Sequence, residues 1–390
     1  MRDVQAMTHE IAVSIELISD NNRAMLRGVI DYVNSRPDLR VHKIGAIPFI
    51  PIERLVKWNG AGAICTAETA ERFDSVVKLK IPCVSVSLHR KPPKSLPTVH
   101  SDNEAIGKLA AEHLYEMGLR RFAFVGHQQW LHNQERLHGF QAALQKFGSN
   151  CEIVDVQFTD SKQWAWPSGI RQRPLTTALK RLVKPVGIFA AHDEFAHDVV
   201  GTLKRLGTRI PDDAAVIGVN NNRLICETTD PPLSSIVQSA RQIGYHAGKL
   251  LHELIRGKEP PQQPIRLPPG GLVARQSSDY SAVDDDHILS ALRFIQLRCG
   301  HPITVVDVAD HVGVSRRTLD KRCVANFGYP MAEQIRRTRI KKARELLRST
   351  NMQVTSIGFM CGYESASGFV RAFREITGTT PAEHRRQTQR

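Results

Sequence analysis

Basic side chains follow a glycine turn in "VVDVADHVGVSRRTLDKRCVANFG" (residues 305–328), where Arg316, Arg317 and Lys321 come soon after Gly313. Arginine and lysine donate hydrogen bonds to guanine edges in the major groove of DNA and pair with its phosphates. A helix-turn-helix unit carries such side chains into the groove, whereas an ordinary helical hairpin leaves them solvated. The stretch therefore raises the hypothesis of a DNA-reading unit.

The same arrangement occurs again in "VTSIGFMCGYESASGFVRAFREITGTTP" (354–381), with the turn at Gly362. In each copy a serine can cap the second helix, and apolar residues can face one core. The expected core positions are Val305, Val308, Ala309, Val312, Leu319 and Phe327, then Ile357, Phe359, Phe369 and Phe373. The residues expected to contact DNA are Ser315, Arg316, Arg317, Asp320, Lys321, Ser365, Ser367, Arg371 and Arg374. Two copies with basic outer faces favour DNA binding over a solvated hairpin.

A strong helix is expected between the copies, over residues 331–349. Its apolar side is formed by Ile335, Ile340, Ala343, Leu346 and Leu347. Such a helix is roughly 28 Å long at 1.5 Å per residue, close to the roughly 34 Å between successive major-groove faces. One chain could thus place two helices in consecutive turns. We expect the more basic first copy to read bases and the second to anchor the backbone.

Composition fits an anionic partner and a cytoplasmic protein. The formal net charge is +14, and residues 283–390 carry 18 Lys and Arg against 11 Asp and Glu. The 7 cysteines stand singly without a CxxC pair, which fits reduced thiols better than disulfides or a zinc site. No apolar run approaches the roughly 20 residues needed to span a bilayer. The leading "IAVSIELIS" lacks the cleavage site of a signal peptide.

Residues 11–278 alternate short apolar runs with helical patterns, which is typical of βαβ units. Strands are expected within 11–17, 62–67, 82–88, 121–127, 152–158, 186–192 and 214–220. Helices are expected within 22–36, 103–118, 135–148, 194–207 and 240–257, and a further helix within 284–300. So many units indicate two doubly wound lobes, with a ligand beyond the carboxyl ends of the strands.

Polar residues at those strand ends could grip a polyhydroxylated ligand. They occur in "SDNNR" (19–23), "HR" (89–90), "HNQER" (132–136), "AAHDE" (190–194), "GVNNN" (218–222) and at Gln238. Carboxylate, amide and guanidinium groups make paired hydrogen bonds to sugar hydroxyls, while aromatic faces cover the C–H side. Trp130, Trp164 or Trp166 could supply such a face, or could simply pack.

Two families resemble these patterns. Residues 285–388 resemble the AraC-type DNA-binding domain, and "IGFMCGYESASGFVRAFREITGTTPAEHR" follows its signature through the terminal "GTTP". The front resembles the periplasmic-binding-protein-like sensor of LacI/GalR-type regulators in "SDNEAIGKLAAEHLYEMGLRRFAFVG", "ERLHGF", "AAHDE", "AVIGVNN" and "SSIVQSARQIGYHAGKLL". The order of the two domains, a sensor followed by an AraC-type tail, is similar to that in regulators of xylose operons.

The resemblance implies an α/β two-lobed sensor of type I followed by an all-α AraC-type domain with two helix-turn-helix motifs. The expected boundaries are 1–278 for the sensor, 279–284 for a linker and 285–388 for the DNA-binding domain, with motifs at 304–327 and 354–377. The implied ligand residues are Asn22, Arg90, Arg136, His192, Asp193, Asn220, Asn221 and Gln238. Asn220 stands where the family pattern has Asp. The expected ligand is therefore xylose or a related monosaccharide, and the resemblance does not identify which sugar it is. A homodimer that contacts RNA polymerase and activates transcription is implied, with no cofactor and no metal.

Two alternatives remain open from the sequence. A sugar-processing enzyme with a DNA-binding tail would need catalytic motifs, and no P-loop, HExxH or GxSxG is present. In "HDEFAH", His192 and His197 would diverge on a helix, which disfavours a metal site there. A DNA-binding dimer without any small ligand is the other alternative, and ligand titration separates it from a sensor.

Overall fold

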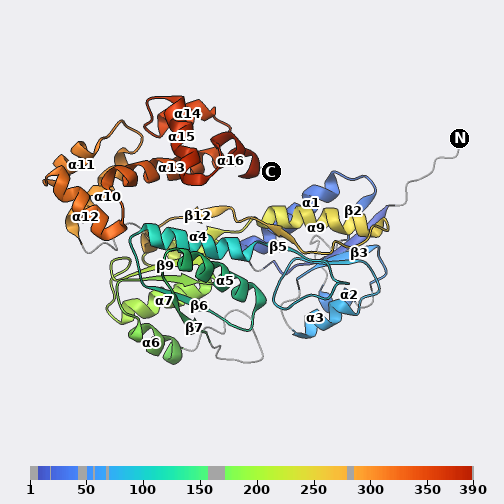
Figure 1. Cartoon of the computed structure of the whole chain (residues 1–390). Helices are drawn as coiled ribbons and strands as arrows, with labels where there is room; N and C mark the ends of the chain where they lie inside the picture. The colour runs from blue at the N-terminus through green and yellow to red at the C-terminus, as the bar shows by residue number, and fades with distance from the viewer. Residues whose placement is uncertain are drawn as a thin grey trace. The chain divides into compact units, whose positions relative to one another are not determined.

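The computed structural model describes residues 8–17, 19–42, 51–55, 58–66, 70–156, 172–278 and 285–388. The expected linker at 279–284 lies outside these ranges. The chain divides into two compact units, Met1–Tyr115 with Arg120–Asp279, and Glu116–Leu119 with Tyr280–Arg390 (Figure 1).

The first lobe of the front unit is built on a parallel sheet with the strand order β2-β1-β3-β4. Its elements are β1 (His9–Ser14), α1 (Asp20–Asn34), β2 (Leu39–Val41), α2 (Ile52–Leu55), β3 (Gly62–Cys65), α3 (Ala70–Val77), β4 (Cys83–Ser85) and α9 (Ala240–Ile255). The apolar sides of α1 and α9 bury one face of the sheet together with Ile11, Val13 and Ile64. The core of this lobe therefore needs residues from both ends of the sensor.

The second lobe contains a sheet with the order β12-β10-β9-β8-β6-β7, in which only β12 runs antiparallel to its neighbour. Its elements are α4 (Asn103–Glu116), β6 (Phe122–Gly126), α5 (Leu131–Lys146), β7 (Cys151–Asp155), α6 (Gln172–Arg181), β8 (Val186–Ala190), α7 (Asp193–Arg205), β9 (Ala214–Val219), α8 (Arg223–Thr228), β10 (Ser234–Val237), β12 (Gly271–Val273) and the 3-10 turn Gln276–Ser278. A separate parallel pair, β5 (Val99–Ser101) with β11 (Ile265–Leu267), completes the unit.

Each lobe contains a pair of helices that cross at glycine. A Cβ on Gly28 of α1 would lie 1.9 Å from the carbonyl oxygen of Arg241, and one on Gly244 of α9 would lie 1.8 Å from that of Met25. In the second lobe, a Cβ on Gly107 of α4 would lie 2.0 Å from the carbonyl oxygen of Arg136 on α5. Only glycine permits such close backbone approach.

Every regular element among the described residues of the rear unit is a helix. Its helices are α10 (Asp286–Arg298), α11 (Val305–Val312), α12 (Arg316–Phe327), α13 (Met331–Ser349), α14 (Val354–Met360), α15 (Ala366–Thr377) and α16 (Pro381–Thr388). The turns lie at the expected glycines, and both glycines are left-handed, with φ of 75° at Gly313 and 77° at Gly362. The predicted span of the long helix between the copies is confirmed.

The expected core positions are buried or partly buried with one exception. Phe359 is 54% exposed, so the prediction that it faces the core is wrong. At 100° per residue, Phe359 lies far around the short α14 from Ile357, which is buried. Residues two positions apart lie on nearly opposite faces of an α-helix, so Ile357 and Phe359 cannot both face the same core.

Across the residues that the structure describes, no helix has the length and apolar content needed to cross a membrane.

Candidate ligand site and DNA interface

The carboxyl ends of four neighbouring parallel strands, β6, β8, β9 and β10, meet at one edge of the second sheet. His127 follows β6, His192 follows β8, Asn220 follows β9 and Gln238 follows β10. Ligands of doubly wound sheets bind at such an edge. The topology thus brings the predicted strand-end residues to one side of the sheet.

Arg136 is the buried cation of this region. Its residue surface is 2% exposed, although it lies on α5 rather than on a strand end. Its Nε donates to Asn103 Oδ1 at 3.0 Å, and its Nη1 donates to the carbonyl oxygen of Ala191, directly after β8. Burial lowers the pKa of Arg136 to about 10, against the opposing effect of Asp193 and other acids. The guanidinium therefore stays charged at neutral pH.

Aromatic rings gather beside it in a cluster that we call the histidine cluster, made of His89, Trp130, His132, His192 and Phe195. The rings of His89 and His132 lie 4.7 Å apart, and those of His132 and His192 lie 5.1 Å apart. Trp130 is stacked with His132 at 5.6 Å and with Phe195 at 6.1 Å. Trp130, one of the predicted aromatic candidates, thus lies next to His192. Trp164 and Trp166 lie outside the described residues.

Within the cluster, His132 and His192 form a neutral pair. The Nε2 atoms are 3.0 Å apart, and His132 Nδ1 lies 3.1 Å from the carbonyl oxygen of Leu88. A carbonyl only accepts, so His132 carries its proton on Nδ1 and its Nε2 accepts the proton of His192. Protonating His132 would place an N–H donor on both Nε2 atoms, so this contact requires a neutral His132. Burial, followed by nearby positive charge, lowers the pKa of both histidines well below the usual value.

A chain of hydrogen bonds joins two other candidates to β5. Ser101 Oγ donates to Gln238 Oε1 at 2.6 Å, and Gln238 Nε2 donates to Asn220 Oδ1 at 2.5 Å. Asn220 has φ of 115°, a conformation that side chains rarely adopt. Such strain is often kept where a side chain must be aimed. Because amides both donate and accept, these two side chains are suited to hydroxyl groups.

Asp193 and Asn221 are engaged with the protein itself. Asp193 is fully buried and accepts from Ser235 Oγ at 2.5 Å and from the backbone N–H of Asn222 at 2.7 Å. Burial raises the pKa of Asp193 to about 8, although these hydrogen bonds oppose the rise. Asn221 Oδ1 accepts from Arg275 Nη2 at 2.9 Å. Both residues hold the loop after β9 in place, whatever else they do.

Asn22 and Arg90 come from the first lobe. Asn22 is partly buried, and its Nδ2 donates to the carbonyl oxygen of Glu16 at 2.6 Å. Arg90 is exposed. The adjacent Leu88 and His89 accept, through their carbonyl oxygens, from the backbone of His132 and Leu131 at 3.0 and 3.1 Å. The segment after β4 is therefore tied to the start of α5.

Sequence reasoning missed two residues, Asn103 and His132. Asn103 orients the guanidinium of Arg136, and its type and position at the start of α4 suggested only a helix end. His132 opens the quoted "HNQER" stretch, in which only Arg136 was singled out. Among the described residues, no group of three or more His, Cys, Asp or Glu side chains could hold a metal ion.

The second helix of the first helix-turn-helix motif, α12, begins as predicted with Ser315, whose Oγ accepts from the backbone N–H of Thr318 at 3.2 Å. Arg316, Arg317 and Lys321 are exposed along it. Asp320 differs from these, because its Oδ1 accepts from the backbone N–H of Met331 at 3.0 Å. Since Pro330 offers no capping side chain, Asp320 satisfies the start of α13.

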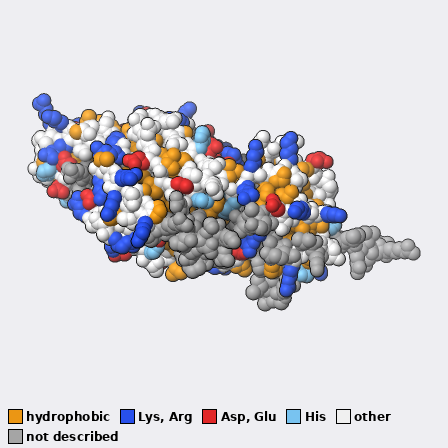
Figure 2. All heavy atoms as spheres, turned by 90° about the horizontal axis from the view of Figure 1, so that it is seen from below, with side chains coloured by type: hydrophobic (Ala, Val, Ile, Leu, Met, Phe, Trp, Pro, Cys, Tyr) orange, Lys and Arg blue, Asp and Glu red, His pale blue; other side chains and the backbone are white. Residues whose placement is uncertain are grey.

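The second helix of the second helix-turn-helix motif, α15, begins with Ser365, whose Oγ accepts from the backbone N–H of Gly368 at 3.2 Å. Ser367, Arg371 and Arg374 are exposed. On the face shown in Figure 2, lysine and arginine side chains are interspersed with acidic ones. In the tail, the two serine-capped helices with exposed arginine and lysine side chains form the candidate DNA interface.

Comparison with known proteins supports both halves. A periplasmic binding protein-like domain matches residues 111–278, and a helix-turn-helix domain matches residues 308–387. The xylose operon regulatory protein of Escherichia coli K12 is 32% identical over 342 residues, 86% of each chain. That of Haemophilus influenzae is 31% identical over 74% of each chain. A solved structure titled xylose-binding transcription activator covers 98% of this chain and 99% of its own, with 28% identity and a TM-score of 0.59.

The fold, the two helix-turn-helix motifs and the relatives define a sugar-responsive, DNA-binding transcription regulator, with a sensor of the periplasmic-binding-protein type I fold and an AraC-type tail. The chain belongs to the family of the xylose operon regulatory protein. The predicted fold class and family resemblance are confirmed. The relatives are regulators, which decides against the enzyme alternative.

Proposed function

We propose that this chain activates transcription when xylose, or a closely related monosaccharide, binds its sensor. The observation that carries the proposal is similarity along the whole chain to a regulator titled xylose-binding transcription activator. The sensor and the tail are matched together, in the same order. Activation by a pentose is therefore the function that the relatives favour.

The chemistry at the edge of the second sheet supports a sugar ligand. The buried guanidinium of Arg136 supplies charge-assisted donors, and the amides of Asn220 and Gln238 can donate and accept. Trp130, beside His192, offers an aromatic face. We propose that the ligand residues are the eight predicted ones: Asn22, Arg90, Arg136, His192, Asp193, Asn220, Asn221 and Gln238.

DNA reading is proposed for the two capped helices of the tail. The helix α12 would discriminate bases through Arg316, Arg317 and Lys321, while α15 would anchor the backbone through Arg371 and Arg374. Joined by α13, the two would enter consecutive major grooves. The nine predicted residues remain the proposed contacts.

Control by the sugar is proposed to be a population shift. A bound sugar would stabilise one state of the sensor and change how two chains pair, so that their tails occupy tandem sites. The resulting dimer would contact RNA polymerase in the cytoplasm. The shift is limited by the difference in sugar affinity between the two states.

Calorimetry of the full chain against a panel of pentoses and hexoses tests the sugar. We expect D-xylose or a related pentose to bind best; a folded chain that binds no member would contradict the proposal. Arg136→Lys keeps the charge but loses the planar fork, and losing one or two charge-assisted hydrogen bonds should weaken binding by about 10- to 100-fold.

Two variants test the division of labour between sensor and tail. Arg136→Ala should abolish the sugar response and preserve DNA affinity, whereas Arg317→Ala should do the reverse. If Arg317→Ala impaired sugar binding while Arg136→Ala impaired only DNA binding, the assignment of the two units would be wrong. Circular dichroism of each variant verifies folding.

A further inference from the structure

The two helix-turn-helix units have separate hydrophobic cores. The first core takes Met331 and Ile335 from the start of α13, and the second takes Ile340, Ala343 and Leu347 from its later turns. Among the described residues, the two clusters have no member in common. Apolar packing thus fixes each unit on α13, while the angle between the units also depends on contacts that cross from one to the other.

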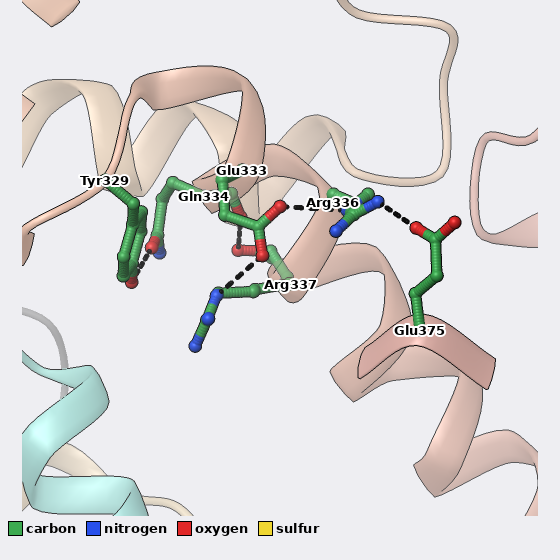
Figure 3. Close-up of polar contacts among 7 residues, drawn as sticks. Tyr329, Glu333, Gln334, Arg336, Arg337 and Glu375 are labelled. Atoms are coloured by element: carbon green, nitrogen blue, oxygen red, sulfur yellow. Dashed lines mark hydrogen bonds and ion pairs between the residues drawn. The ribbon is translucent and has the colours of Figure 1, made fainter. Parts of the chain in front are cut away.

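One network of polar side chains connects the two helix-turn-helix units, and Figure 3 shows its members. Glu333 Oε2 accepts from Arg336 Nε at 2.9 Å, and Glu333 Oε1 accepts from Arg337 Nε at 2.9 Å. Arg336 Nη1 donates in turn to Glu375 Oε2 at 2.5 Å. Because Glu375 lies on α15, the guanidinium of Arg336 bridges α13 and the second reading helix.

The other branch leads to the first reading helix. The guanidinium of Arg337 lies 4.6 Å from the centre of the Tyr329 ring, and Tyr329 Oη donates to Gln334 Oε1 at 2.8 Å (Figure 3). The Tyr329 ring stacks at 5.8 Å on Phe327, the last residue of α12. A continuous path of contacts therefore runs from the end of α12, through Glu333, to α15.

Glu333 is the branch point of this path. Its side chain is 21% exposed, less than those of Arg336 at 38% and Glu375 at 49%. Each carboxylate oxygen serves a different arginine, so one side chain sets the positions of both. Exposed ion pairs usually contribute little to stability, but paired guanidinium contacts strongly fix geometry.

We propose that Glu333 is a positioning residue that, by holding Arg336 and Arg337 together, fixes the angle and separation of α12 and α15 and thereby the half-site spacing that the chain accepts on DNA. The inference rests on the proposed insertion of both helices into consecutive major grooves. Selectivity for the half-site spacing would then come from side chains that do not need to contact any base.

Selection from a pool of random-sequence duplexes tests this role. The full chain, with and without D-xylose, would select DNA, and sequencing would give the distribution of separations between the two enriched half-sites. Spacing-shifted duplexes would then be compared by titration. Wild type should strongly prefer one separation, since one added base pair both translates and rotates the second site.

Arg336→Lys is the decisive variant because it keeps the net charge. A single ammonium group cannot reproduce the two guanidinium contacts, one to each carboxylate, in the same geometry. The preference for the selected spacing over one a base pair longer should fall by about tenfold, equivalent to about 1.4 kcal/mol. Glu333→Gln should broaden the spacing likewise. It also removes a negative charge and so strengthens binding to any DNA, which is why spacing rather than affinity is compared.

Arg344→Lys is the matched control, an equally conservative change at an exposed position of α13. Its spacing profile should equal that of wild type. If wild type has a preferred spacing and both test variants keep it, the role of Glu333 is overturned while two-groove reading stands. If the test variants bind every duplex more weakly by the same factor and keep the spacing preference, the role of Glu333 is overturned as well. A wild-type chain with no preferred spacing would overturn the two-groove proposal and the positioning role with it.

Discussion

The histidine cluster predicts that the sensor loses stability as the pH falls. The slope of its unfolding free energy against pH should change by one proton's worth when a single buried histidine is replaced. Burial lowers the pKa of His89 to about 4 and that of His132 and His192 well below the usual value. Below about pH 6.5 the unfolded chain binds protons on these three side chains that the folded chain does not. Their contribution to the free energy of unfolding is complete above that pH and is lost as the pH falls, each group by about 1.4 kcal/mol per pH unit.

Asp193 acts in the opposite direction. Burial raises its pKa to about 8, so the folded chain holds a proton that the unfolded chain has released. This contribution is complete below the unfolded pKa and is lost as the pH rises toward 8. Between about pH 4.5 and 6, the unfolded chain binds three protons on the histidines that the folded chain lacks, and the folded chain holds one proton on Asp193 that the unfolded chain lacks. The unfolded chain therefore binds two more protons than the folded chain. These four groups then give a net slope of about 2.7 kcal/mol per pH unit.

Urea unfolding of wild type and single variants across that range checks the calculation. His132→Gln should lower the slope of unfolding free energy against pH by about 1.4 kcal/mol per pH unit, and Asp193→Asn should raise it by the same amount. Glu194 also has a raised pKa, so differences from wild type are compared rather than absolute slopes. His138→Gln, at an exposed position of the same helix, is the control. An unchanged slope for His132→Gln, or a shallower one for Asp193→Asn, would refute the reasoning.

Three further predictions concern stability and are checked by thermal or urea unfolding. Gly107→Ala should destabilise the sensor by about 1–3 kcal/mol or more, because its Cβ would meet the carbonyl oxygen of Arg136 at 2.0 Å. If the variant were as stable as wild type, α4 and α5 would have to move apart without cost, which would contradict the close-packing argument. Ser365→Ala should cost about 1 kcal/mol through loss of the helix cap, whereas Ser365→Asp should not, and equal losses would point away from capping. Asp320→Ala should cost about 1–2 kcal/mol by removing the acceptor for the Met331 N–H, and Asp320→Asn should restore most of it.

Much of the fold could be predicted because its signals are local. The span 331–349 was recoverable from apolar spacing, and the caps at Ser315 and Ser365 from the side-chain type that precedes each helix. The buried parallel strands stand out as short apolar runs between helical patterns. Phe359 was misplaced because α14 is a seven-residue helix, too short for periodicity to define its buried face.

The contacts within the candidate site could be predicted far less well. The sequence places Asp193 at a strand end, where acids often bind ligands, yet its oxygens accept from Ser235 and Asn222. These partners are brought near only by the order of the strands in the sheet. His132 and His192 are 60 residues apart, so their pairing is a product of topology as well. Whether the eight ligand candidates bind sugar stays a prediction.

The glycine crossing of α1 and α9 has a consequence for synthesis of the chain. Because α9 supplies Ile243, Ala247 and Leu251 to the core that encloses β1, the first lobe cannot complete its interior before residue 255 has been made. The five consecutive strands β6 to β10, by contrast, are all neighbours in the second sheet and end before α9 begins. The lobe that begins first on the ribosome is therefore the one that must wait, with its apolar strands exposed, for the other to be translated.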